Sequence, residues 1–96
     1  MIDYIFLMHN DGTSTGGFDW EPYIAKLQKS GHFQGGSAVG GGECVNKSGL
    51  APKISGHLTG FIRVQAEDLT QAKNLLDGNP VFETGGTVEI RELPRG

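Results

Sequence analysis

The sequence predicts an α+β fold in which four strands and two helices follow the order β-α-β-β-α-β. Short apolar or alternating runs mark the strands, and apolar residues spaced at i, i+3, i+4 and i+7 mark the helices. Glycine-rich stretches separate these segments and act as turns. The chain has 96 residues, which fits one domain spanning residues 1–96.

The first strand is predicted at residues 3–9, DYIFLMH, a run that is apolar on both faces. Residues 10–17, NDGTSTGG, have turn composition and are expected to form a loop. The first helix is predicted over residues 19–30, with Asp19 at its start and Gly31 as a left-handed stop. Its apolar face consists of Trp20, Tyr23, Ile24 and Leu27. We expect Trp20 and Tyr23 to pack in the core rather than to stack on a ligand.

The middle of the chain is rich in glycine. A second strand is expected at residues 32–39, weakened by Gly35 and Gly36, and a hairpin is expected to continue through residues 43–47. Residues 48–56 have no periodicity and are expected to be a connection. The glycines are not followed by the Lys-Ser/Thr pair and helix of a phosphate loop, so backbone geometry explains them better.

The third strand, residues 57–66, alternates with period two. We expect Leu58, Ile62 and Val64 to face the helices and the intervening residues to face away. The second helix follows, with Glu67 or Asp68 at its start, residues 78–80 at its end, and an apolar stripe of Leu69, Ala72, Leu75 and Leu76. The last strand, residues 87–93, is expected to bury Val88 and Ile90 and to turn Glu89 and Arg91 the other way.

This element order predicts a ferredoxin-like fold, a four-stranded antiparallel sheet with both helices on one face. The second face of such a sheet remains uncovered. Both alternate sets of the first strand are apolar, so the set that points away from the helices also favours burial, and Phe61 does the same. A small chain gains stability from extra burial, so we expect a homodimer in which two sheets face each other across a shallow space.

Composition excludes several functions. The net charge is -3 with charges of both signs scattered, which gives no footprint for nucleic acid. No apolar stretch approaches the roughly 20 residues that span a bilayer. We therefore expect a cytoplasmic protein that acts without nucleic acid or membrane. Cys44 is the only cysteine, is interpreted as a free thiol, and excludes an internal disulfide. We expect no cofactor, and no metal, because His9, His32 and His57 lack close ligand spacing.

Several sequence features together resemble the YCII-related (DGPF) family. They are the beginning YIFLMHND, the spacing of Trp20, Tyr23 and Leu27, the glycines that follow, and the ending NPVFETGGTVEIR. The resemblance covers nearly the whole chain and implies a dimeric α+β barrel of two facing ferredoxin-like sheets. Residues 48–51, Ser-Gly-Leu-Ala, stand where DGPF-type members carry Asp-Gly-Pro-Phe.

A second departure concerns a pair of residues suspected of catalysis in other family members. Those members have a histidine in the first helix and an aspartate before the proline that follows the second helix. Tyr23 and Asn79 occupy these positions here. A phenol titrates near 10 and an amide does not titrate, so this pair does not supply an imidazole oriented by a carboxylate.

The outward residues of the third and last strands form a candidate pocket between the sheets. His57, Thr59, Phe61 and Arg63 would line it, joined by Glu89 and Arg91. Such a pocket suits a small anionic or aromatic ligand, because arginine pairs with carboxylates through two bonds. Alternatively, Arg63 and Glu89 form a cross-strand ion pair that stabilises the sheet or the dimer.

His9 and Asp11 lie at the end of the first strand, at the edge of this predicted cavity. A histidine oriented by Asp11 would serve as a general base, which makes His9, Asp11 and His57 the catalytic candidates. Turn chemistry at the end of a strand is the alternative explanation. The ligand-binding candidates are Arg63, Phe61, Tyr23, Glu89 and Arg91.

Two functions therefore remain open. The first is a small-molecule-binding homodimer that acts as a cofactor-independent enzyme with a His or Tyr acid/base. The second is a non-catalytic interaction or regulatory module. Pocket polarity separates them: a histidine within reach of a carboxylate favours the enzyme, and Arg63 neutralised by Glu89 favours the module.

Overall fold

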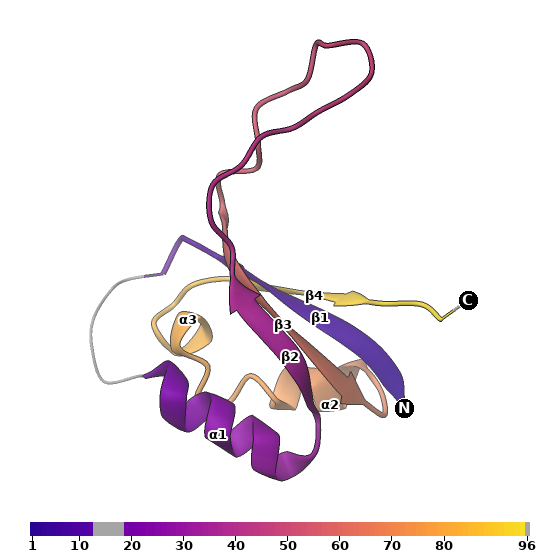
Figure 1. Ribbon diagram of the computed structural model, residues 1–96. Coiled ribbons are helices and arrows are strands. Elements are labelled where there is room, and N and C mark those ends of the chain that lie inside the picture. Colours follow the sequence, from indigo (N-terminus) through magenta and orange to yellow (C-terminus); the bar gives the residue numbers. More distant parts are fainter. Residues whose placement is uncertain (13–18, 96) are drawn as a thin grey trace.

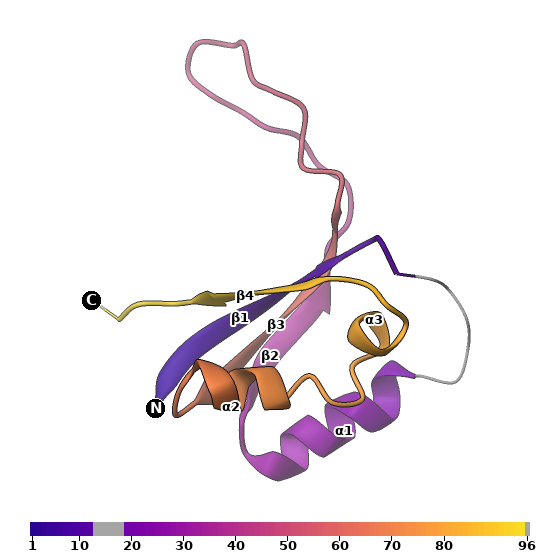
Figure 2. The same ribbon diagram turned by 180° about the vertical axis from the view of Figure 1, so that it is seen from behind.

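The computed structural model describes residues 1–12 and 19–95 and confirms the α+β fold. Strands β1 (Ile2–His9), β2 (Phe33–Ala38), β3 (Leu58–Ala66) and β4 (Val88–Glu92) form one sheet in the order β2-β3-β1-β4. Each neighbouring pair is antiparallel. Helices α1 (Trp20–Ser30), α2 (Leu69–Asn74) and α3 (Pro80–Glu83) lie on one face of the sheet (Figure 2). The arrangement is ferredoxin-like, as predicted.

The hydrophobic core lies between the sheet and the helices. The even-numbered side chains of β1, and those of β3 from Ile62 onward, point into it and meet the apolar sides of α1 and α2. Its buried members are Tyr4, Phe6, Met8, Ile62, Val64, Ala66, Tyr23, Leu27, Ala72 and Leu76. Val88 and Ile90 of β4 pack against this core, which confirms the face predicted for that strand.

Local chemistry fixes the ends of the helices. Gly31 adopts the predicted left-handed conformation after α1, with φ of 80°. Asp19 precedes α1 with extended geometry but makes no side-chain cap, whereas the Asp68 side chain caps α2 by accepting from the Gln71 amide. The predicted second helix ends at Asn74, because the chain turns there and a short third helix begins after Asn79.

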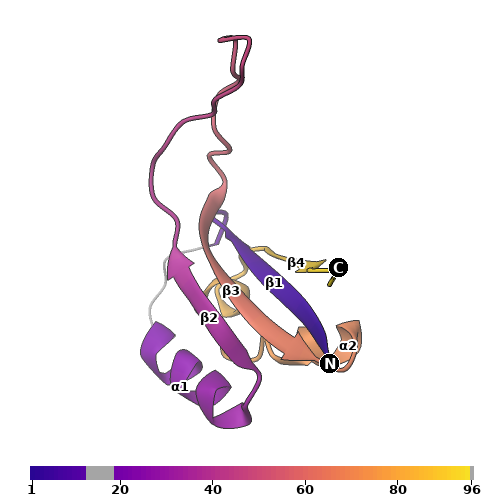
Figure 3. The same ribbon diagram turned by 45° about the vertical axis from the view of Figure 1, so that its right-hand side comes forward.

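Three expectations about packing and strands were wrong. No hairpin continues through residues 43–47. Instead, residues 39–57 contain no strand and stand away from the sheet (Figure 3). Leu58 does not join the core, because a bulge beside His9 shifts the register and places Leu58 opposite His9. Trp20 is 42% exposed rather than buried, because it occupies the first position of α1, at the edge of the packed layer.

Hydrogen bonds near the start of β1 join it to the segment that follows β4, and we call this set of bonds the clamp. The Leu93 amide donates to the Asp3 carbonyl, and the Arg95 guanidinium donates to both Asp3 carboxylate oxygens, at 2.6 and 3.1 Å. Gln65 donates to the same carboxylate. These bonds, led by that of Arg95, lower the pKa of Asp3 to about 2.

The clamp makes part of the stability depend on pH. Because the pKa of Asp3 is lowered on folding, its contribution is complete above the usual value of 3.8 and is lost as the pH falls toward 2. We expect Asp3→Asn to lower the free energy of unfolding at pH 7 and to flatten its decline between about pH 4 and 2. Urea unfolding at several pH values measures this. Asp77→Asn, which breaks an exposed pair with Lys26, is the control, and parallel profiles for Asp3→Asn and the parent would contradict the clamp.

Gly36 is required by the close approach of β2 to β3. A Cβ at this position would lie 2.6 Å from the Phe61 carbonyl oxygen and 3.1 Å from the Ile62 Cα. We expect Gly36→Ala to lower the free energy of unfolding by about 1–3 kcal/mol, because backbone must move. Gly42→Ala, where nothing lies within 4 Å, is the matched control and should change stability by less than about 0.5 kcal/mol. Equal urea midpoints for the two variants would contradict this reading.

Candidate functional site

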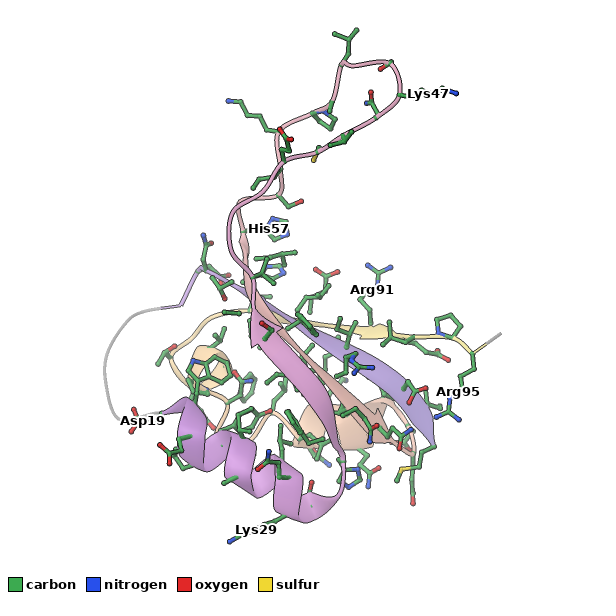
Figure 4. All side chains as sticks on the ribbon, viewed as in Figure 1. Asp19, Lys29, Lys47, His57, Arg91 and Arg95 are labelled. Atoms are coloured by element: carbon green, nitrogen blue, oxygen red, sulfur yellow. The ribbon has the colours of Figure 1, made fainter. Side chains whose placement is uncertain are left out.

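Four polar side chains gather on the face of the sheet that none of the described helices covers, here called the open face. The His9 Nε2 lies 3.2 Å from Oε1 of Glu89, and the other Glu89 oxygen accepts from Arg91 at 3.1 Å. The His57 ring meets the His9 ring edge to face, with centroids 4.8 Å apart. We call His9, His57, Glu89 and Arg91 the polar cluster. Figure 4 shows Arg91 pointing away from the helices.

The strands position this cluster. His9 ends β1, Glu89 lies opposite Leu7 and Arg91 lies opposite Ile5. His57 precedes β3 and is held there by its carbonyl, which accepts from the Asn10 amide. The Arg91 bond, followed by that of His9, lowers the pKa of Glu89. The carboxylate is therefore ionised near neutral pH and orients the His9 ring, an arrangement that suits a general base.

Asp11 makes its hydrogen bonds outside the polar cluster. Its carboxylate accepts from the Thr87 amide at 2.8 Å and from the Thr87 hydroxyl at 2.7 Å. These bonds lower the pKa of Asp11, with a small further contribution from the charge of His9, and tie the loop after β1 to the start of β4. The hydrogen-bonding partner of His9 is therefore Glu89 rather than Asp11.

Arg63 and Phe61 lie on the open face but not in the polar cluster. Arg63 donates to the Gln34 carbonyl at 3.0 Å and lines a shallow hollow with Asp3, Gln34, Gln65 and Arg95. The expected ion pair between Arg63 and Glu89 does not form, because β1 runs between β3 and β4 and separates them. Phe61, half-buried, lies opposite Leu7.

Tyr23 and Asn79 meet on the helix side of the sheet. The Tyr23 hydroxyl donates to the Leu75 carbonyl at 2.8 Å, and burial raises the pKa of Tyr23 to about 12. The Asn79 amide lies beside this hydroxyl and lowers that pKa by a smaller amount. Tyr23 therefore stays a neutral phenol near neutral pH, where it cannot accept a proton as a base.

Asn79 is fully buried and organises the following turn. Its side-chain oxygen accepts from the amides of Val81 and Phe82, which caps α3. Its Nδ2 has no hydrogen-bond partner among the residues that the structure describes, although it lies close to Tyr23. The pair thus has a structural role in holding α1, α2 and α3 together.

A cavity of about 460 Å³, partly open to solvent, lies between the sheet and the helices. Its floor is made of the small residues Gly36, Ala38 and Gly60, and its walls include Trp20, Ile24, Phe33, Met8 and Val81. The sequence alone did not predict this cavity. The available signal was the small residues on the strands next to α1, which leave space that larger side chains would fill.

The structure also bears on metals and membranes. In the described parts of the chain, no group of three or more His, Cys, Asp or Glu side chains is placed to hold a metal ion. Within residues 1–12 and 19–95, no helix has both the length and the apolar character needed to cross a bilayer.

The cap made by Asn79 can be tested with two variants that differ in one oxygen. Asn79→Ala removes the acceptor for two amides, whereas Asn79→Ser restores an oxygen that favours the start of a helix. We expect Asn79→Ala to be less stable than Asn79→Ser by about 1 kcal/mol, measured by urea unfolding. Equal stabilities would show that Asn79 contributes through its volume alone.

Comparison with known proteins places the fold. No family model and no curated protein matches the sequence. Among solved structures, the chain is similar to TftG, the 5-chloro-2-hydroxyhydroquinone dehydrochlorinase of Burkholderia phenoliruptrix AC1100, in complex with 2,5-dihydroxybenzoquinone. The TM-score is 0.59 at 14% identity, over 100% of this chain and 96% of that one. At this identity, the likeness shows a shared fold.

Proposed function

We propose that residues 1–96 form a single YCII-related domain that works as a homodimer of the dimeric α+β barrel type and binds a small aromatic molecule. The motif order along the chain and the ferredoxin-like sheet support the family assignment. The uncovered sheet face, with Ile5, Leu7 and Phe61 on it, supports the dimer.

The cavity between the sheet and the helices is the observation that carries the ligand proposal. Its volume of about 460 Å³ lies within the range of small-molecule sites, roughly 300–1,000 Å³. Trp20 and Phe33 supply aromatic walls, and the backbone of the glycine floor allows a flat ring to approach closely. Thr59 belongs to the cavity lining, and its hydroxyl donates to the Met8 carbonyl and keeps lone pairs that can accept further hydrogen bonds.

The structural neighbour supports the same class of ligand. TftG was solved with a dihydroxylated quinone, a small flat six-membered ring. A ring of that size fits a cavity with apolar walls and few polar groups. We therefore propose hydroxylated quinones and related phenols as the first ligands to test.

The polar cluster favours a second candidate, a cofactor-independent enzyme with its site on the open face. His9 lies 3.2 Å from an ionised carboxylate, and Arg91 lies next to it, so a base and an anion-binding group are adjacent. A facing sheet would enclose this cluster and exclude water, which strengthens both interactions. Arg63 and Phe61, farther along the same face, would contact the remainder of an anionic or aromatic ligand.

Ligand binding can separate these candidates. The parent protein would be screened by thermal shift and ligand-detected NMR against dihydroxybenzoquinones, hydroquinones, benzoates and aliphatic carboxylates. A ligand at 100 times its Kd stabilises the folded state by about 2.7 kcal/mol, or roughly 10 °C or more for a chain of this size. We expect the ring compounds to raise Tm and the aliphatic carboxylates to leave it unchanged.

Three variants locate the site. Ala38→Trp fills the cavity and should weaken binding at least tenfold, whereas Ala25→Trp, on an exposed position of α1, should not. His9→Ala should leave binding intact if the ligand occupies the cavity. Loss of binding in His9→Ala but not in Ala38→Trp would transfer the site to the polar cluster, and no response to any compound would favour the interaction module.

A further inference from the structure

Residues 39–57, here called the arm, project from the sheet between β2 and β3 (Figures 1 and 3). Every residue of the arm is exposed. Figure 4 places Lys47 near its tip and His57 at its base. Among the described residues, its hydrogen bonds lie at the base, where Asn10 donates to Gly56, and in a turn at the tip around Asn46. Residues 40–45 and 51–55 make no hydrogen bond with the rest of the described chain.

The arm carries apolar side chains into solvent. Val45 is 81% exposed, Leu50 is 86% exposed and Ile54 is 41% exposed. Three consecutive glycines, residues 40–42, precede them and give the arm no stiffness of its own. Apolar side chains gathered in solvent mark contact sites with other surfaces in many proteins.

The accessible area of the chain is larger than that of a compact protein of the same mass. The accessible area is 6435 Å², whereas a compact protein of 10.3 kDa exposes about 5,300 Å². The radius of gyration is 14.8 Å, against roughly 12.5 Å for a compact domain of this length. The excess of about 1,100 Å² exceeds the roughly 800 Å² that each partner buries in a standard interface.

The same chain offers a surface that matches the arm. Ile5 and Leu7 of β1 and Phe61 of β3 form an apolar strip along the open face, between Arg63 and the polar cluster. An arm of about nine residues in each direction reaches roughly 30 Å, and a four-stranded sheet is only about 20 Å wide. The arm is therefore long enough to cross a neighbouring sheet.

We propose that the arm of each chain docks across the open face of a second copy, with Val45, Leu50 and Ile54 against the strip of Ile5, Leu7 and Phe61. A two-fold axis makes this contact twice, so two arms and two open faces are covered together. The proposal rests on the homodimer of the proposed function and places the two arms in the shallow space between its facing sheets. It also makes the polar cluster of one copy a site that the partner's arm helps to close.

Shortening or altering the arm tests this contact. Replacing residues 41–56 by Asn-Gly leaves a tight connection between β2 and β3 that keeps His57. This variant, and the triple variant Val45→Ser, Leu50→Ser, Ile54→Ser, should raise the dimer Kd at least tenfold in analytical ultracentrifugation. Lys47→Ser with Lys53→Ser, polar changes in the same arm, should leave the dimer Kd within about threefold.

Cys44 supplies a direct readout, because it is exposed, lies in the arm and is the only cysteine. A benzophenone attached to Cys44 should crosslink the arm to peptides of β1 or β3 after irradiation. Mixing isotopically heavy and light protein distinguishes crosslinks between copies from those within one chain. We expect crosslinks between copies, lost when Leu7→Ser and Phe61→Ser are combined in a chain whose fold is checked by circular dichroism.

The outcomes separate the docking proposal from the function it builds on. A parent dimer whose Kd is unchanged by shortening the arm, or crosslinks confined to one chain, would overturn the docking while leaving the homodimer in place. A parent that is monomeric at all concentrations would overturn both the docking and the dimer. Ligand binding in the cavity is measured independently, since the cavity is lined by residues of one chain.

Discussion

The central strand β1 is the constraint on which the rest of the structure depends. It is apolar on both faces, with Tyr4 and Phe6 toward the helices and Ile5 and Leu7 on the open face. A strand of this kind must lie inside a sheet, and β1 does so between β3 and β4. One face is covered by the helices of the same chain. The other face, with Ile5 and Leu7 on it, is not covered by any described helix.

The two faces of the sheet differ in chemistry because the strands direct different side chains to each of them. On the helix side, Gly36 and Gly60 bring the main chain of two strands close together and leave space above them, so the cavity is apolar and its floor is backbone. On the open face, β1 places two aliphatic residues between the Arg63 end and the polar cluster. A charged site and an apolar cavity can therefore coexist without sharing residues that would couple their electrostatics.

The periodicity of the sequence was enough to predict the four strands of the sheet, helix α1, and the residues of β4 that face the helices. It failed at Leu58, because a bulge changes the face of a strand without changing the composition of the run. It failed at Trp20, because a helical stripe does not show where the packed layer ends. The separation of Arg63 from Glu89 was within reach of sequence reasoning, since the predicted topology already places the first strand between theirs.

The residues that meet through space were harder to foresee. His9 and His57 belong to segments almost fifty positions apart, and their contact depends on the register of β1 with β3. The sequence predicts that Asn79 ends a helix. Only its buried side chain, which accepts from the Val81 amide, shows that it also begins the next helix. The cavity exists because small residues leave space between the sheet and the helices. Small residues in a strand are equally consistent with a bend, so the sequence does not distinguish the two.

The position of β1 has a consequence for how the chain is made. His9 and Glu89 are 80 positions apart, and β1 can complete its pairing only after β4 has been synthesised. At about 5–20 residues per second, a ribosome needs roughly 4–16 seconds to reach that point. Strand β3 is made earlier and can pair with one edge of β1, but the edge that β4 will occupy stays unpaired during this interval. The nascent chain therefore carries an unpaired edge on an apolar strand, a feature that favours pairing with other chains, until its last strand arrives.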